Sequence, residues 1–196
     1  MDTRTFGGRL GGKAVVLYAS MFGATEIVAE RVADELTARL GAPVASRDIT
    51  WFDPADLAAY DLIVIGSSTW NVGQLPSDMS VKLPQLAQLD LSGKMLALFG
   101  TGDQLGYPDT YLDAVGIIAD ELAGTGAKLI GSIAIHDYTF SDSLAMRDQL
   151  LLGLAVDEDN EPELTQARIV AWVDQLLAEL SASAPDVETA PFAVAV

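Results

Sequence analysis

The sequence has little or none of several residue types, and each shortage excludes a class of site. None of its 196 residues is cysteine, so disulfides, thiolate metal centres and iron–sulfur clusters are excluded. Only one residue is histidine, and we expect no metal site. No apolar run approaches the length that crosses a bilayer, so we expect no membrane insertion.

Basic residues are also scarce, because 11 lysines and arginines stand against 28 acids and give a net charge of −17. Such a surface repels nucleic acid and anionic lipid, and it attracts basic partner proteins. The alternative reading is that the acidity only favours solubility. We take a cytoplasmic location as the default and expect a monomer without nucleic-acid partners.

Half of the residues are hydrophobic, and the length suits one domain with a buried core. We expect this domain over residues 13–181, between flexible extensions at 1–12 and 182–196. Continuous apolar runs predict buried strands, and apolar positions at helical spacing predict helices. The expected strands are 14–19, 44–49, 62–65, 95–99 and 129–135, and the expected helices are 25–40, 77–89, 109–122 and 164–180.

The alternation of strands and helices predicts an α/β fold with a parallel sheet covered on both faces. In such sheets, ligands bind beyond the carboxyl ends of the strands. The loops that follow the first, third and fourth strands are therefore the candidates for a binding site.

The loop after the first strand leads directly into a helix and contains glycine and hydroxyl side chains, which suits a phosphate. It lacks the P-loop and GxGxxG signatures and any lysine or arginine, so it fits a mononucleotide held by neutral donors. An ordinary capped helix start explains the same pattern. The candidate residues here are Ser20, Met21, Phe22, Gly23, Ala24 and Thr25.

The loops after the third and fourth strands each carry an aromatic residue, Trp70 and Tyr107, in a polar or glycine-rich setting. A flat side chain in such a loop is a platform for a planar ring. The alternatives are a tryptophan folded over its own loop, and a glycine-rich turn in which Asp103 caps the next helix. The candidate residues in these loops are Ser68, Thr69, Trp70, Asn71, Val72, Gly73, Thr101, Gly102, Asp103 and Tyr107. Together, the three loops fit a phosphate attached to a flat heterocycle.

Three longer motifs, 69–73, 99–107 and 153–160, closely resemble those of the long-chain flavodoxins. The resemblance runs from about residue 13 to residue 180. It implies the flavodoxin-like doubly wound fold, with a five-stranded parallel sheet in the order 2-1-3-4-5 and helices on both faces. It also implies that a loop over 136–147 interrupts the fifth strand, which resumes near 150–156.

The same resemblance implies a low-potential one-electron carrier with non-covalently bound FMN, which is not an enzyme. A basic ferredoxin/flavodoxin-NADP reductase is the kind of partner implied. The segment 20–25 would bind the FMN phosphate, and Trp70 and Tyr107 would sandwich the isoalloxazine ring. The Asn71–Val72 peptide would lie near the flavin N5 atom, and the segment 101–103 would line the pyrimidine edge.

The sequence departs from the family pattern at Phe22, where a hydroxyl residue usually precedes the glycine, and has Ala24 after it. A lost hydrogen bond to a charged group is worth about 1.5–3 kcal/mol, so we expect weaker phosphate binding unless another group compensates. Phe22 would then cover the ring or face a partner. Two alternatives stay open: an FMN-dependent NAD(P)H:quinone reductase of the same fold, and an interaction domain without a cofactor. We expect Trp51 and Trp172 to be packing residues.

Overall fold

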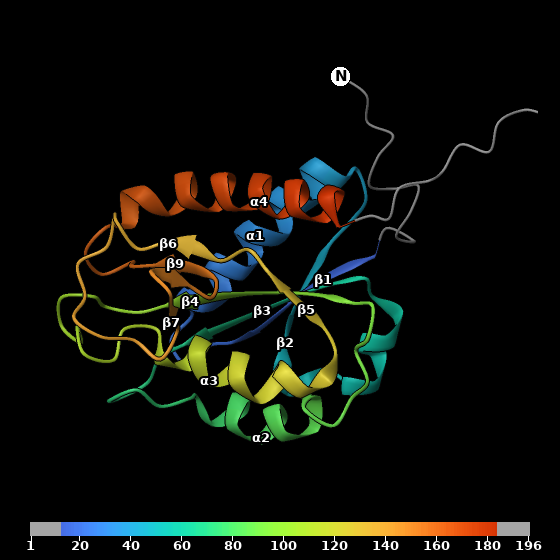
Figure 1. Ribbon diagram of the computed structural model, residues 1–196, viewed down its shortest axis with the longest axis horizontal. Helices are drawn as coiled ribbons and strands as arrows, with labels where there is room; N and C mark the ends of the chain where they lie inside the picture. The colour runs from blue at the N-terminus through green and yellow to red at the C-terminus, as the bar shows by residue number, and fades with distance from the viewer. Residues whose placement is uncertain (1–12, 184–196) are drawn as a thin grey trace, which may run out of the picture.

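The computed structural model describes residues 13–183 (Figure 1). The extension predicted at 1–12 and the last residues of the one predicted at 182–196 lie outside this range. The main sheet has the parallel order 2-1-3-4-5, as expected. Its strands are β2 (Ala45–Asp48), β1 (Ala14–Ala19), β3 (Leu62–Ser68), β4 (Met95–Thr101) and β5 (Lys128–Ile130), with β9 (Leu154–Val156) also beside β4.

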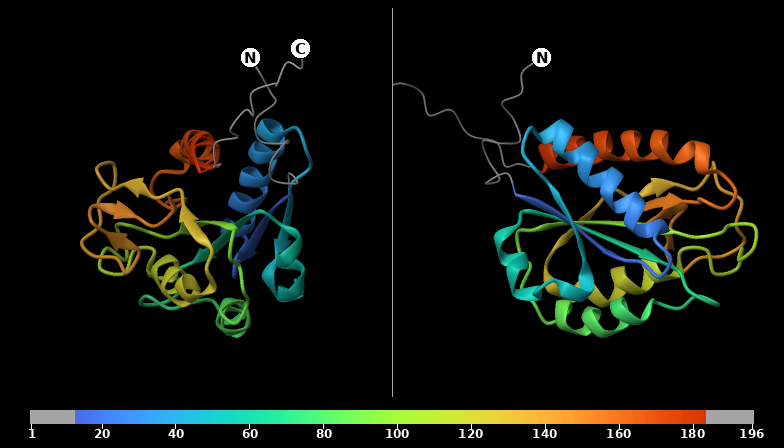
Figure 2. Two further views of the ribbon diagram at one scale, coloured as in Figure 1. Left: turned by 45° about the vertical axis from the view of Figure 1, so that its right-hand side comes forward. Right: turned by 180° about the vertical axis from the view of Figure 1, so that it is seen from behind.

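Helices cover both faces of this sheet, as the left view of Figure 2 shows. One face carries α1 (Ala24–Leu40) and α4 (Thr165–Ala182), and the other carries α2 (Ser77–Leu86) and α3 (Asp113–Leu122). The side chains of β1 alternate between two buried clusters, because successive residues of a strand point to opposite faces. Every residue of β1 is buried, which explains why this strand reads as a continuous apolar run.

The fifth strand is interrupted, as the resemblance implied, but it ends earlier than the predicted range of 129–135. After Ile130 the chain turns at Gly131, whose φ is +80°. A Cβ there would lie 2.5 Å from the Leu176 side chain and 2.8 Å from Trp172 Nε1, so α4 leaves room only for glycine. The insert then forms a small antiparallel sheet of β6 (Ile133–Ala134), β8 (Leu150–Leu151) and β7 (Met146–Arg147).

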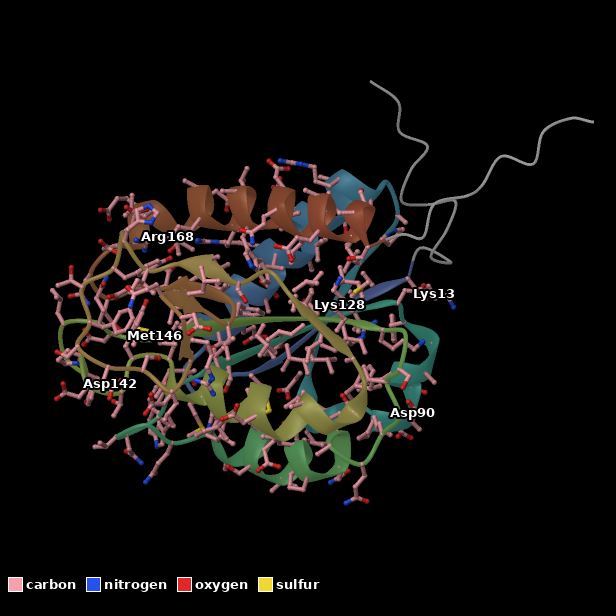
Figure 3. All side chains as sticks on the ribbon, viewed as in Figure 1. Lys13, Asp90, Lys128, Asp142, Met146 and Arg168 are labelled. Atoms are coloured by element: carbon pink, nitrogen blue, oxygen red, sulfur yellow. The ribbon has the colours of Figure 1, made fainter. Side chains whose placement is uncertain are left out.

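The insert lies at the end of the molecule that also holds the loops after β3 and β4 (Figure 1). In Figure 3, Asp142 and Met146 of the insert lie at this end with Arg168, whereas Lys13 and Asp90 mark the opposite end. Chain segments that bear on the candidate site are therefore concentrated at one end of the sheet.

Two predicted helices are shorter in the structure. The helix predicted from residue 109 begins only at Asp113, because the chain before it forms turns and Leu112 has a φ of +60°. The helix predicted over 77–89 includes Pro84 but ends at Leu86. Short 3₁₀ helices complete the chain: η1 (Ile49–Trp51), η2 (Pro54–Ala59), η3 (Ala123–Thr125) and η4 (Pro162–Leu164).

The two tryptophans that we expected to pack behave differently. Trp172 is buried, and its Nε1 donates a 2.7 Å hydrogen bond to the Gly131 carbonyl, which confirms the expectation. The expectation for Trp51 is wrong, because its side chain is 86% exposed. Ile49 and Phe52 are the residues of this segment that pack into the core, and the turn of η1 places the Trp51 side chain between them on the surface.

Candidate functional site

A cavity of about 260 Å³ lies where β1, β3 and β4 end. The loops that follow these strands extend to the left in Figure 1. The predicted residues that line the cavity are Ser20, Met21, Phe22, Ala24, Thr25, Ser68, Thr69, Trp70, Asn71, Thr101, Gly102, Asp103 and Tyr107. Gly23, Val72 and Gly73 belong to the same loops but do not line it.

The first wall of the cavity is the turn that starts α1. Gly23 precedes the helix with a φ of +93°, and its N–H donates a 3.0 Å hydrogen bond to Ser20 Oγ. Thr25 is buried, and its hydroxyl shares a 2.8 Å hydrogen bond with the hydroxyl of Thr101 at the end of β4. The first N–H groups of a helix have no helical acceptor and lie at its positive end. This wall therefore offers neutral donors to an anion.

The second wall is the tight loop after β3. Trp70 and Gln74 exchange two backbone hydrogen bonds of 2.7 and 2.8 Å, which close the loop between them. Asn71 and Gly73 both have positive φ, of 47° and 78°. The side chain of Val72, at the tip, is 73% exposed. The loop therefore holds the Asn71–Val72 peptide in a constrained turn beside the cavity.

The start of α3 supports this second wall. The N–H of Ala114 donates a 3.3 Å hydrogen bond to Thr69 Oγ1. Asp113 packs against Gly73, where an added Cβ would lie only 2.5 Å from its Oδ2. The Oδ1 of Asp113 accepts a 2.8 Å hydrogen bond from the N–H of Leu144 in the insert. Burial raises the pKa of the Asp113 carboxyl, and Asp113 thus connects the insert to the loop beside the cavity.

The third wall is the glycine-rich loop after β4. Asp103 Oδ1 accepts hydrogen bonds from the N–H of Gly106 (2.7 Å), the N–H of Leu105 (3.1 Å) and Asn160 Nδ2 (2.8 Å). The bond from Gly106 is the main cause that lowers the pKa of Asp103. Asp103 therefore fixes its own loop, in addition to lining the cavity. Tyr107 lines the cavity with a half-exposed ring.

A fourth wall, from the loop after β9, was missing from the predicted site. Glu158 and Asp159 line the cavity, and burial is the main cause that raises the pKa of Asp159. Arg31 Nη1 lies 3.8 Å from Glu158 Oε1. The acidic run 157–163 has the composition of a solvated loop, but Asp157 is fully buried and accepts the N–H of Gln104 at 3.1 Å. The signals in the sequence were the position of this run directly after the resumed strand and its overlap with the motif 153–160.

Phe22 and Trp70 meet across the edge of the cavity. Their ring centroids are 5.3 Å apart and their planes are inclined by 50°. The hydroxyl oxygen of Ser68, on the β3 wall, is buried without a hydrogen-bond partner among the described residues. The cavity thus combines donors at one end, aromatic faces at the other and a buried hydroxyl that lacks a partner among the described residues, and this arrangement fits a flavin mononucleotide.

The comparison with known families agrees with this geometry, since the flavodoxin family model matches residues 16–172. The chain belongs to the flavodoxin family. It is 40% identical over 167 residues to a flavodoxin of Synechococcus elongatus, with 85% of this chain and 97% of the relative covered. A flavodoxin 2 of Escherichia coli is 34% identical over 168 residues, covering 85% of this chain and 95% of the relative.

Solved flavodoxin structures share the fold. A Fusobacterium nucleatum flavodoxin bound to flavin mononucleotide superposes with a TM-score of 0.79 at 20% identity, covering 85% of this chain and 98% of that one. Oxidised flavodoxin 2 of Bacillus cereus gives a TM-score of 0.66 at 27% identity, covering 85% and 99%. These similarities confirm the flavodoxin-like fold expected from the sequence motifs.

Membership of the flavodoxin family also settles the class of activity. The chain is an FMN-based electron carrier and not an enzyme, as expected from its motifs. The quinone reductase and the cofactor-free interaction domain are thereby set aside. Over residues 13–183, no cluster of metal-ligating side chains is found. No helix in the same range is both long and apolar enough to cross a membrane.

Proposed function

We propose that this flavodoxin is a low-potential electron carrier that holds FMN in the cavity described above. The observation that carries the proposal is the meeting of a donor-lined helix start with two aromatic side chains, Trp70 and Tyr107, from separate loops. Bound FMN supplies the redox chemistry, because it takes up and releases electrons singly. The protein binds the cofactor, orients it and sets its potential.

The start of α1 is the proposed phosphate site. Ser20 and Thr25 provide hydroxyl groups, and the first N–H groups of the helix provide backbone donors. The segment 20–25 contains no basic side chain, so neutral donors alone hold the phosphate. Trp70 and Tyr107 would stack on the isoalloxazine ring and keep water from it.

The rigid loop after β3 places a peptide at the reactive edge of the ring. Asn71 and Gly73 hold the loop with positive φ, and the Trp70–Gln74 backbone pair closes it. We assign the Asn71 carbonyl, in the Asn71–Val72 peptide, as the group that would accept a hydrogen bond from a protonated flavin N5. A hydrogen bond made in only one redox state shifts the potential in favour of that state.

Acidic side chains around the cavity lower the potential at which the protein is fully reduced. Asp103, Glu158 and Asp159 all line the cavity, and the phosphate adds further negative charge. One such charge at about 8 Å and an effective dielectric of about 20 costs an added electron about 2 kcal/mol, or about 90 mV. These residues would therefore make the protein a strong reductant when it is fully reduced.

The proposed partners are basic redox proteins, such as a ferredoxin/flavodoxin-NADP reductase, and the proposed location is the cytoplasm. Three large apolar side chains that line the cavity are exposed at its mouth: Met21, Phe22 and Tyr107. A chain of net charge −17 attracts a basic surface to this mouth, and salt screens that attraction.

The binding site is tested by releasing the flavin from purified protein, identifying it by chromatography and titrating it back. We expect FMN at one equivalent and quenching of its fluorescence on rebinding, because the ring stacks on aromatic side chains. Electron transfer from NADPH should require an added reductase and should slow as salt is raised. A protein that leaves FMN fluorescence unquenched, or that oxidises NADPH alone, would contradict the proposal.

A further inference from the structure

Phe22 occupies a position in the phosphate loop where it has no donor to offer. Its side chain is 84% exposed, although it is large and apolar. Of the hydroxyls that remain in this wall, Thr25 already shares a hydrogen bond with Thr101, whereas Ser20 Oγ accepts the Gly23 N–H and keeps its own O–H as a donor. The carboxylates of Glu158 and Asp159 line the same cavity. The phosphate end of the cavity therefore has few groups that can bind an anion.

The one aromatic partner of Phe22 in the described chain is Trp70, with centroids 5.3 Å apart. The two residues come from the loops after β1 and β3, and both line the cavity. A tilted pair at this distance is an attractive aromatic geometry. The contact therefore joins the wall that faces the phosphate to the wall that faces the ring.

We propose that Phe22 is a positioning residue that braces the Trp70 indole against the flavin ring. This inference rests on the proposed FMN site. Because Phe22 acts through Trp70, it strengthens the binding of the ring and so makes the cofactor's affinity depend less on the phosphate. A ligand with the ring but without the phosphate, namely riboflavin, depends on Phe22 as much as FMN does.

The experiment measures the dissociation constants of FMN and riboflavin for the apoprotein by fluorescence quenching. Phe22→Ala should weaken the binding of both flavins by the same factor, about threefold to tenfold, which is the value of an aromatic pair. Phe22→Tyr keeps the ring and should restore both affinities. Leu105→Ala is the matched control, since Leu105 is an exposed apolar residue that does not line the cavity, and both affinities should stay unchanged.

Phe22→Thr separates the two ends of the site. It removes the ring but adds a hydroxyl to the phosphate loop, so riboflavin affinity should fall as in Phe22→Ala while FMN affinity falls less or rises. The ratio of the two dissociation constants therefore changes in Phe22→Thr and stays constant in Phe22→Ala.

A double-mutant cycle tests whether Phe22 acts through Trp70. In a Trp70→Leu background, Phe22→Ala should change riboflavin affinity less than twofold, because the braced partner is absent. The inference is overturned if Phe22→Ala leaves riboflavin binding of the otherwise wild-type protein unchanged, weakens FMN alone, or has the same effect in both backgrounds. A wild-type protein that binds neither flavin would instead refute the proposed site.

Discussion

At the α1 end of the cavity the donors are hydroxyl and backbone groups, whereas the loops after β3 and β4 present aromatic faces. The first end is built from residues 20–25 without a positive charge and lies in a cavity shared with Glu158 and Asp159. The second end is fixed by the closed turn at Trp70 and by the hydrogen bonds to Asp103. Under the proposed function, this difference means that most of the binding energy for the cofactor would come from the ring, with the phosphate adding to it.

The largest effect is expected at the ring end. Trp70→Ala should weaken FMN and riboflavin alike, because stacking on an aromatic side chain is worth about 1–3 kcal/mol per ring, or about fivefold to 150-fold in affinity. Trp51→Ala is the control, since Trp51 is an exposed tryptophan outside the cavity. Equal flavin affinities in wild type and Trp70→Ala would contradict the larger contribution that we assign to the ring end of the cavity. Flavin fluorescence titration measures both.

A smaller and more selective effect is expected at the phosphate end. Ser20→Ala removes one hydroxyl next to the start of α1, so FMN affinity should fall by about tenfold, the lower range for a hydrogen bond to a charged group. Riboflavin affinity should not change, because riboflavin has no phosphate. A parallel loss for both flavins would show that Ser20 acts by holding the Gly23 turn and not by contacting the ligand.

The support behind the ring loop can be tested by stability. Gly73→Ala introduces a Cβ at a φ of +78° and within 2.5 Å of Asp113 Oδ2, so the free energy of unfolding should fall by about 2–3 kcal/mol. Gly41→Ala is matched in backbone, with a φ of +67°, but meets no atom within 4 Å. It should cost only about 1 kcal/mol. Urea unfolding of the apoproteins measures both, and equal losses would argue against a close Asp113 contact.

The smallest effect concerns pH. Burial raises the pKa of Asp113, so the folded protein holds this proton more tightly than the unfolded chain does. Its contribution to stability is therefore full below the unfolded pKa and is lost as pH rises through the folded value. Asp113→Asn removes this loss, so the stability of the variant relative to wild type should increase from about pH 4 upward. Unfolding by urea at a series of pH values measures the trend.

Asp103 provides the opposite case for the same pH series. Hydrogen bonds from Gly106, Asn160 and Leu105 lower its pKa, so its contribution to stability is present above the unfolded pKa and is lost as pH falls through the folded one. Asp103→Asn should therefore lose stability relative to wild type at neutral pH and approach it in acid. The same trend with pH in both variants would contradict the assigned environments.

The strands and the loops proposed to hold the ring were predictable because their signals are local. β1, β3 and β4 are apolar runs buried on both faces, and Trp70 and Tyr107 follow strand ends in polar loops. The insert was harder to predict, since β6, β7 and β8 have two residues each and carry no periodic pattern. Short strands of this kind are defined by their pairing and not by their composition.

The remaining features depend on contacts between distant residues. Asp157 is buried because it accepts hydrogen bonds from Gln104 and Asn160, and this brings Glu158 and Asp159 to the cavity. The pairing of Phe22 with Trp70 joins loops from different strands. Neither arrangement leaves a trace in local sequence pattern, because each is set by which loops meet at the end of the sheet.

The electron-carrier function is tested most directly by an anaerobic reductive titration of the protein with its bound FMN, followed by visible absorbance. We predict two separate one-electron steps, with the second at a potential well below that of free FMN, because the acidic walls oppose added negative charge. A single two-electron step at the potential of free FMN would contradict this function.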